Sequence, residues 1–157
     1  MEVVDIEIAA KQLLVFWKKQ KIVSPPNALD DIIYFEFSRS IRLPEDFRLL
    51  FMIANGVVNL FPNYFDEEGF LFYPLKELAT LEDEFSVTQQ RNSTEEHCLI
   101  FAEFMHKSWW YGVKFLKLED SYEIGIIASI DRFKVITRSL AEFIHLYMNN
   151  SSILYDY

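Results

Sequence analysis

The chain opens with hydrophobic positions at helical spacing. Intervals of three and four residues place four of them on one face: Ile6, Ala10, Leu13 and Trp17. Such a stripe is typical of an amphipathic helix, because successive turns bring these positions to the same side. We therefore expect a helix over residues 5–20 that buries this face.

A second helix is expected after the Ser24-Pro25-Pro26 segment, which interrupts the first pattern. Asn27 can serve as its N-cap residue. The stripe of this helix combines three apolar residues with one carboxylate: Leu29, Ile32, Ile33 and Glu36. Since an unpaired charge on a buried face is costly, Glu36 is expected to have a partner.

The third helix has both a start and a stop signal. Proline is preorganised for the first helical position, so Leu43-Pro44 followed by two acids marks its beginning. Apolar residues then recur on one face: Phe47, Leu50, Phe51 and Ala54. Asn55-Gly56 is expected to end the helix, because glycine readily takes the left-handed conformation of a C-cap.

The pattern then becomes β-like. Short strands are expected at residues 57–61 and 70–73 around a turn at 66–69, followed by a helix from Pro74 to about Gln89. Four alternating segments follow, at residues 98–104, 109–115, 122–128 and 133–137. Their short polar connections predict an antiparallel meander. Ser139-Leu140-Ala141-Glu142 is a capping box that opens a last helix.

The order of these elements predicts an α+β fold. A mostly antiparallel sheet would be flanked by N-terminal helices, a middle helix and a C-terminal helix. A length of 157 residues fits one domain, expected to span residues 1–157. With 15 Phe and 8 Tyr, the core should be rich in aromatic rings.

The net charge of the chain limits the classes of partner that we expect. The net charge is −9, and nucleic-acid binding requires phosphate neutralisation, so no nucleic acid is expected. An acidic surface favours a basic protein, although it can also serve solubility alone. The start lacks a basic segment before an apolar run, and no run is long enough to cross a bilayer. With Cys98 as the single cysteine, these features predict a reducing cytoplasm and no membrane association.

Known catalytic and cofactor motifs are missing. The four glycines are isolated, which excludes the clustered loops that cradle phosphates. His97, His106 and His145 do not show zinc spacing, and Cys98 is expected to be a small core residue. We predict no metal, no cofactor and no enzymatic activity. A cleft that brings a histidine and a carboxylate within hydrogen-bonding reach would favour an enzyme instead.

Two acidic runs and one aromatic residue are the candidate partner contacts. The acidic residues are Asp66, Glu67 and Glu68 in a turn, and Glu82, Asp83 and Glu84 in the predicted middle helix. The alternative is that these carboxylates are solvated surface. Within Trp109-Trp110-Tyr111, alternation turns at least one ring away from the core or under a covering helix, and Trp110 is the candidate contact. The alternative is that these rings pack in the core.

The signals of residues 36–56 resemble a known signature. Glu36, Leu43-Pro44, Phe47 and Asn55-Gly56 occur in the order and spacing found in the SUKH superfamily. Later segments resemble it too: Pro74–Leu78, Ile100–Ala102 and Ser139–Ile144. The resemblance covers residues 25–150, the expected core of the domain. Glu36, Leu43, Pro44, Asn55 and Gly56 are then signature residues with a structural role.

The resemblance implies a sheet flanked by helices and non-catalytic protein binding. Bacterial members are immunity proteins that bind and neutralise toxins, often nucleases or deaminases, and this is the preferred prediction. The alternative is a regulatory or scaffolding protein of the Smi/Knr type without a toxin partner. We expect a monomer or a weak homodimer. For Glu36, we predict that its carboxylate accepts backbone N–H groups near the start of the Pro44 helix.

Overall fold

One sheet and five α-helices make up the part of the chain that the computed structural model describes, residues 5–86, 98–116 and 120–157. The helices are α1 (Ile6–Lys19), α2 (Leu29–Arg39), α3 (Glu45–Ile53), α4 (Leu81–Phe85) and α5 (Leu140–Met148). The strands are β1 (Phe70–Phe72), β2 (Ala79–Thr80), β3 (Cys98–Phe104), β4 (Trp109–Phe115), β5 (Tyr122–Ser129) and β6 (Arg132–Thr137). The predicted α+β class is confirmed.

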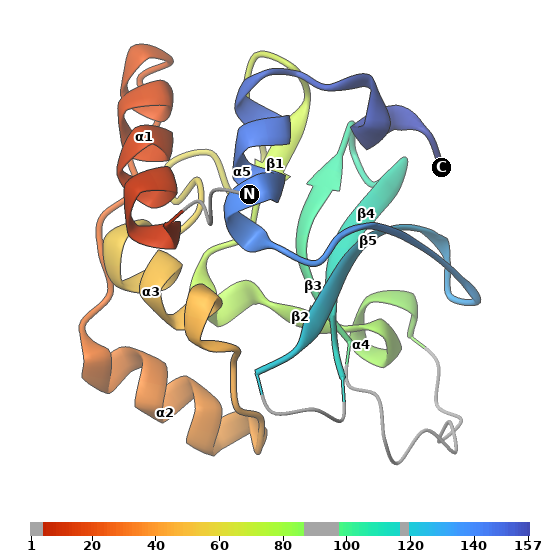
Figure 1. Cartoon of the computed structure of the whole chain (residues 1–157), viewed down its shortest axis with the longest axis horizontal. Helices are drawn as coiled ribbons and strands as arrows, with labels where there is room; N and C mark the ends of the chain where they lie inside the picture. The colour runs from red at the N-terminus through yellow and green to blue at the C-terminus, as the bar shows by residue number, and fades with distance from the viewer. Residues whose placement is uncertain (1–4, 87–97, 117–119) are drawn as a thin grey trace.

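The sheet is antiparallel throughout its described strands. Its order is β1-β3-β4-β5-β6, and β2 pairs with β3 beside β1. The predicted meander is therefore present as β3 to β6, which run back and forth in Figure 1. Two short 3-10 helices complete the described chain: η1 (Leu75–Glu77) and η2 (Ser152–Tyr155). No helix among the described residues has the length and apolarity required to cross a bilayer.

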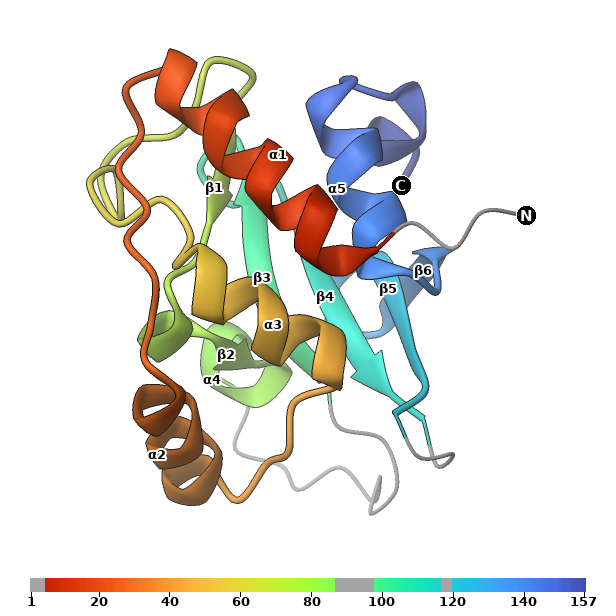
Figure 2. The same cartoon turned by 60° about the vertical axis from the view of Figure 1, so that its left-hand side comes forward.

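Aromatic rings join the helices to the sheet. Figure 2 shows α1 and α3 crossing in front of the strands, with α5 beside them. The rings of Trp17 in α1 and Phe72 are edge-on, with their centroids 5.4 Å apart. The rings of Phe47 in α3 and Phe101 are arranged in the same way, also with centroids 5.4 Å apart. The rings of Phe143 in α5 and Phe101 are also edge-on, with their centroids 5.2 Å apart. Edge-to-face pairs of this kind add stability beyond their buried area, so the core is aromatic as expected.

The first helix follows its prediction closely. Ile6, Ala10, Leu13 and Trp17 are all buried. Asp5 caps the helix, since its Oδ1 accepts the Glu7 N–H at 2.9 Å. Here the apolar periodicity alone was sufficient, because both the helix and the face it buries follow from the same spacing.

The second helix departs from its prediction. Ala28 occupies the N-cap position, while Asn27 instead donates its backbone and side-chain N–H groups to the Phe51 carbonyl. Ile32 and Phe35 are buried, but Leu29 and Ile33 face solvent. The predicted stripe was therefore wrong for two of its three apolar members, because α2 packs against α3 through a face rotated from the one expected.

Two middle segments were also predicted wrongly. Residues 57–61 form turns, in which the Val57 carbonyl accepts the Leu60 N–H at 2.9 Å and the Phe61 N–H at 3.0 Å. The expected helix from Pro74 is divided into η1, β2 and α4, because β2 pairs with β3 and Thr80 starts a new helix by accepting the Asp83 N–H. Residues 87–89 of that prediction lie outside the described residues.

The closing helix has half of its predicted capping box. Ser139 Oγ accepts the Glu142 N–H at 3.2 Å. The Glu142 carboxylate does not return to Ser139 but accepts the Thr137 hydroxyl at 3.0 Å. Thr137 Oγ1 in turn accepts the Ser139 N–H at 3.1 Å, so the last residue of β6 completes the cap.

Candidate protein-binding site

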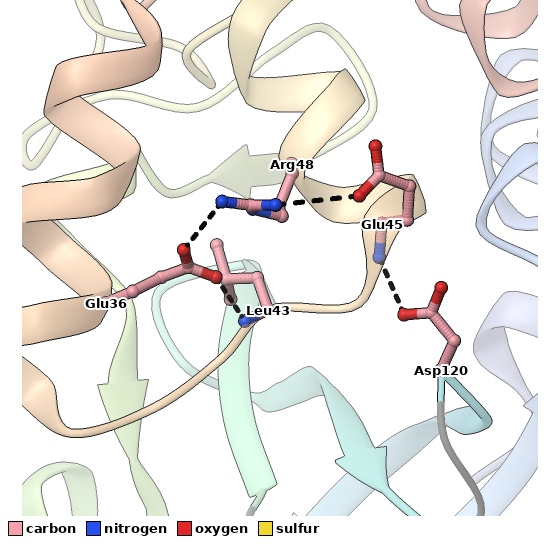
Figure 3. A network of polar contacts seen from close by, with 5 residues as sticks. All are labelled: Glu36, Leu43, Glu45, Arg48 and Asp120. Carbon is pink, nitrogen blue, oxygen red and sulfur yellow. Dashed lines mark hydrogen bonds and ion pairs between the residues drawn. The ribbon is translucent and has the colours of Figure 1, made fainter.

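Glu36 anchors the segment between α2 and α3. Its Oε2 accepts the Leu43 N–H at 2.7 Å, and its Oε1 lies 3.1 Å from Arg48 Nη2 (Figure 3). Arg48 also lies 3.7 Å from Glu45, whose own N–H donates to Asp120. The backbone hydrogen bond predicted for Glu36 is therefore present. The ion pair with Arg48 was not foreseen, because no short-range spacing in the sequence signals it.

Replacing Glu36 should weaken the fold without touching an exposed surface. In Glu36→Ala, the Leu43 N–H and the Arg48 guanidinium lose an acceptor in a half-buried setting, which should cost about 2 kcal/mol of unfolding free energy. Glu36→Gln should cost less, since its amide oxygen can still accept the Leu43 N–H. Urea unfolding followed by circular dichroism measures both.

Glu45 provides the matched control for Glu36. Its side chain is 54% exposed, so Glu45→Ala should change the unfolding free energy by well under about 1 kcal/mol. An equal loss in the two alanine variants would contradict the anchoring role of Glu36.

The other signature residues are structural as well. Leu43 is buried, and Pro44 is the N-cap of α3 and not its first helical residue. The helix α3 ends at Ile53, and Ala54 is already extended. Asn55-Gly56, which was predicted to end the helix, therefore lies just after its actual end. Asn55 Oδ1 accepts the Leu75 N–H at 2.7 Å, which connects α3 to η1.

Asp66 is not an exposed contact. It is 6% exposed, and its Oδ1 accepts the N–H groups of Glu68, Gly69 and Phe70 at 2.8–2.9 Å. Its Oδ2 accepts the Tyr147 hydroxyl. Burial raises the pKa of the Asp66 carboxyl, while these hydrogen bonds act in the opposite direction. Asp66 closes the turn before β1, so its prediction as a partner contact is corrected.

Glu67 and Glu68 remain exposed in the same turn. The Glu67 N–H donates to Gln20 at 3.1 Å, and Glu68 accepts the Asn150 amide at 3.3 Å. This position borders the ends of α1 and α5. Among the described contacts, none joins Glu67 or Glu68 to α4, so the two acidic runs do not form one continuous cluster.

Glu84 and Trp110 are brought together. Trp110 Nε1 donates to Glu84 Oε1 at 3.2 Å, and the Phe85 ring lies edge-on to Trp110 at 4.8 Å. Lys107 pairs with Glu84 at 2.8 Å. On the same helix, Asp83 is exposed and Glu82 is half-buried. Within the aromatic run, Trp109 and Tyr111 are buried, while Trp110 is half-buried at the edge of the core, where α4 covers it.

A small hollow lies next to this pair. Strand pairing aligns Leu71, Glu103 and Trp110 across the sheet, so their side chains share one face. The hollow is a small depression that is partly open to solvent, and its empty volume of about 200 Å³ includes open solvent. Its lining includes Pro62, Tyr64, Phe65, Leu71, Glu103 and His106. We call it the Glu103 hollow.

Glu103 is the unusual group in this hollow. It is 7% exposed, and its Oε2 has no hydrogen-bond partner among the residues that the structure describes. Burial raises the pKa of its carboxyl, and Glu84 adds to the rise, whereas Lys107, His106 and the Tyr73 hydroxyl lower it. The sequence analysis missed Glu103, although a lone carboxylate inside an apolar strand is a signal that could have indicated it.

The enzyme alternative required a histidine and a carboxylate that form a hydrogen bond in a cleft. Glu103 and His106 both line the hollow, but no hydrogen bond joins them in the described chain, and His106 lies 4.8 Å from the Phe65 ring. Within residues 5–86, 98–116 and 120–157, no group of three His, Cys, Asp or Glu side chains could hold a metal ion. Cys98 is half-buried against the core, and His97 lies outside the described residues.

An apolar stripe on α2 is the second feature that the sequence analysis missed. Its members and their exposed fractions are Leu29 (46%), Ile33 (47%), Tyr34 (72%) and Phe37 (84%). Leu29, Ile33 and Phe37 follow at intervals of four, so they share one side of the helix. Figure 1 shows α2 at a corner of the molecule. We call this surface the α2 stripe.

Comparison of the chain with known protein families, with characterised proteins and with solved structures found no match. The resemblance of Glu36, Leu43-Pro44 and Asn55-Gly56 to the SUKH superfamily thus stays a prediction from these motifs.

Proposed function

We propose that this chain is a non-catalytic protein-binding module of the cytoplasm, and that it acts as an immunity protein against a basic toxin domain. The observation that carries the binding role is the α2 stripe. Single exposed apolar residues are common on proteins, but neighbouring ones on one helix face mark an interaction surface. Phe37, at 84% exposure, leaves nearly its whole ring in water.

The α2 stripe has the composition of an interface centre. Phe37 and Tyr34 offer large rings with few rotatable bonds, and aromatic residues are frequent among side chains that dominate binding energy. A partner helix or sheet face that covers Leu29, Ile33 and Phe37 would remove them from water together. The gain would scale with the apolar area buried, at about 25 cal/mol for each Å².

Charge supports a basic partner. The chain has a net charge of −9, and Asp30 and Asp31 lie in the first turn of α2 beside the stripe. A partner with an apolar centre and a basic rim would match both properties. A nuclease must attract phosphates with positive charge, so the same field would steer it toward this chain.

The immunity role and the regulatory role require different kinds of partner protein. An immunity protein would occlude the active site or substrate channel of a toxin, whereas a Smi/Knr-type regulator would bind a partner that is harmless by itself. Capture of the partner on the immobilised chain, followed by expression of the captured protein in cells, separates the two. Toxicity that co-expression of this chain relieves supports immunity, and absence of toxicity supports the regulatory alternative.

Substitutions in the α2 stripe should abolish capture of that partner. Ile33→Ala with Phe37→Ala removes two exposed side chains and should weaken binding by about 100-fold, as loss of central interface residues does. Because both positions face solvent, the unfolding free energy should stay nearly constant. Isothermal titration calorimetry measures the affinity.

The control for the α2 stripe is a pair of exposed aliphatic residues on another helix. Ile8 and Val15 of α1 are 54% and 57% exposed, so Ile8→Ala with Val15→Ala removes exposed apolar side chains elsewhere. Native affinity in the α1 variant and loss in the α2 variant are expected. Native affinity in both would contradict binding through α2.

Charge reversal tests the contribution of the acidic turn separately. Glu67→Lys with Glu68→Lys should slow association with the captured partner several-fold and reduce its dependence on salt, because long-range attraction acts mainly on the association rate. Surface plasmon resonance at two salt concentrations measures both. Unchanged association would remove the turn from the binding surface and leave the α2 stripe unaffected.

A further inference from the structure

The Glu103 hollow contains an incomplete charge arrangement. Lys107 lies in this region, and it pairs with Glu84 at 2.8 Å. Glu84 also accepts Trp110 Nε1, so it has two donors, whereas Oε2 of Glu103 has no donor in the described part of the chain. A buried polar oxygen without a partner is rare in folded proteins, because it loses water and gains nothing in return.

The surroundings of this oxygen restrict what could reach it. Leu71 and Phe65 are apolar members of the lining, and Leu71 is the strand partner of Glu103 on the same sheet face. Tyr64 and His106 also line the hollow and are exposed, so their side chains can turn without disturbing the core. A ligand must therefore be narrow at its tip, and its stem can be apolar.

The chemistry of the free oxygen favours an ammonium group. A primary ammonium is a compact cation with three N–H donors on a flexible methylene stem, which can lie along apolar or aromatic walls. A guanidinium is a wide planar group that prefers two acceptor oxygens side by side. Here one carboxylate oxygen is free, so a lysine fits this hollow better than an arginine.

We propose that the Glu103 hollow is a binding site for a primary ammonium group, supplied by a lysine side chain of the partner protein. The ammonium would donate to Oε2 of Glu103, and the lysine stem would pack along Phe65 and Leu71 between Tyr64 and His106. The assignment to a partner lysine rests on the proposed protein-binding function. The ammonium site itself does not, because it can be measured without the partner.

The Lys107–Glu84 ion pair keeps this site open. If Glu84 lost its charge, Lys107 could turn toward Glu103 and satisfy the free oxygen from within the chain. Glu84 therefore acts as a positioning residue for Lys107. Glu84→Gln should weaken ammonium binding several-fold, although Glu84 does not touch the ligand.

The test uses n-butylammonium, which reproduces the end of a lysine side chain, and tetramethylammonium as a control without N–H donors. Both are titrated into the labelled chain at equal ionic strength, and NMR follows the Trp110 indole N–H and the Glu103 carboxyl signal. We expect saturable shifts with n-butylammonium alone, and their loss in Glu103→Gln. Equal shifts with the two cations, or shifts that persist in Glu103→Gln, would overturn the proposal.

Titration with pH provides an independent arm. The ammonium requires the ionised carboxylate, so n-butylammonium binding should weaken as the pH falls through the raised pKa of Glu103. Glu84, Lys107, His106 and Tyr73 face the same carboxyl and stay present in Glu103→Gln. That variant should therefore bind weakly at every pH. A native pH dependence in it would assign the effect to one of these neighbours and refute the Glu103 site.

Stability distinguishes a ligand site from a structural carboxylate. Burial raises the pKa of Glu103, so the ionised form destabilises the folded state, and this cost appears as the pH rises above the ordinary glutamate value of 4.5. Glu103→Gln should then unfold at a higher urea concentration than the native chain at pH 8, with the difference shrinking toward pH 4. A lower unfolding midpoint at pH 8 would show a structural role and overturn the proposal.

Two further comparisons identify the source of the ammonium. Nα-acetyl-lysine methylamide should bind at least as tightly as spermidine at equal ionic strength, and tighter spermidine binding would assign the site to a free polyamine. The Ile33→Ala/Phe37→Ala variant should retain n-butylammonium binding. Loss of partner capture with intact ammonium binding, or the reverse, separates failure of the α2 interface from failure of this site.

Discussion

Asp66→Ala is expected to lower the free energy of unfolding by about 4 kcal/mol, because several buried donors lose their acceptor together. The Asp66 carboxylate accepts three backbone N–H groups of the turn before β1 and the Tyr147 hydroxyl of α5. Tyr147 in turn accepts Trp17 Nε1 at 2.9 Å. One carboxylate thus connects α1, α5 and the start of the sheet.

Two variants show whether the connection or the charge matters. Asp66→Asn keeps an oxygen for the three backbone N–H groups and places an amide donor against the Tyr147 hydroxyl, so it should cost about 2 kcal/mol. Glu67→Ala, one residue along and exposed, should cost well under about 1 kcal/mol. Guanidinium unfolding measures all three, and equal losses at positions 66 and 67 would contradict this assignment.

Gly56→Ala is expected to cost about 3 kcal/mol or more, for two separate reasons. Gly56 has a φ of +63°, a left-handed conformation that alanine adopts at a cost. A Cβ there would also lie 2.6 Å from the carbonyl carbon and oxygen of Tyr73. These are backbone atoms of the segment after β1, so relief requires the chain to move.

Gly56→Asn and Gly69→Ala separate the two costs. Asparagine tolerates the left-handed conformation, so Gly56→Asn should remain nearly as unstable as Gly56→Ala if the contact with Tyr73 dominates. At Gly69, φ is +103° and the nearest atom to a Cβ is the flexible Met105 sulfur at 2.5 Å, so Gly69→Ala should lose less. Urea unfolding ranks the three variants, and the largest loss in Gly69→Ala would refute the role of the Tyr73 backbone.

The candidate contacts illustrate how far local patterns reach. Asp66, Glu67 and Glu68 are equivalent along the chain, yet Asp66 is buried while its two neighbours are exposed. Strand alternation predicted that one ring of residues 109–111 would face away from the core or lie under a covering helix, and Trp110 is half-buried under α4. Its meeting with Glu84 could not be predicted, because the two residues are separated by 26 positions and α4 is held in place by β2.

The α2 stripe also shows what the local sequence pattern cannot predict. Apolar residues occur around much of α2, at Leu29, Ile32, Ile33, Tyr34, Phe35 and Phe37. Periodicity then indicates a helix but does not select the face that is buried. Packing against α3 selected Ile32 and Phe35, and the remaining apolar side chains became the candidate interface.

The amino-acid pattern by itself determined the α+β class, the face that α1 buries, the four-stranded meander and the hydrogen bond from Leu43 to Glu36. These features depend on spacing, turn residues and the cost of isolated charge, all of which act over a few positions. Only the tertiary structure decided that Asp66 is a buried acceptor, that residues 57–61 are turns, that Oε2 of Glu103 lacks a hydrogen-bond partner among the described residues, and that α2 exposes its apolar stripe. Those outcomes depend on which distant segments meet, because burial and hydrogen-bond supply are properties of the packed chain.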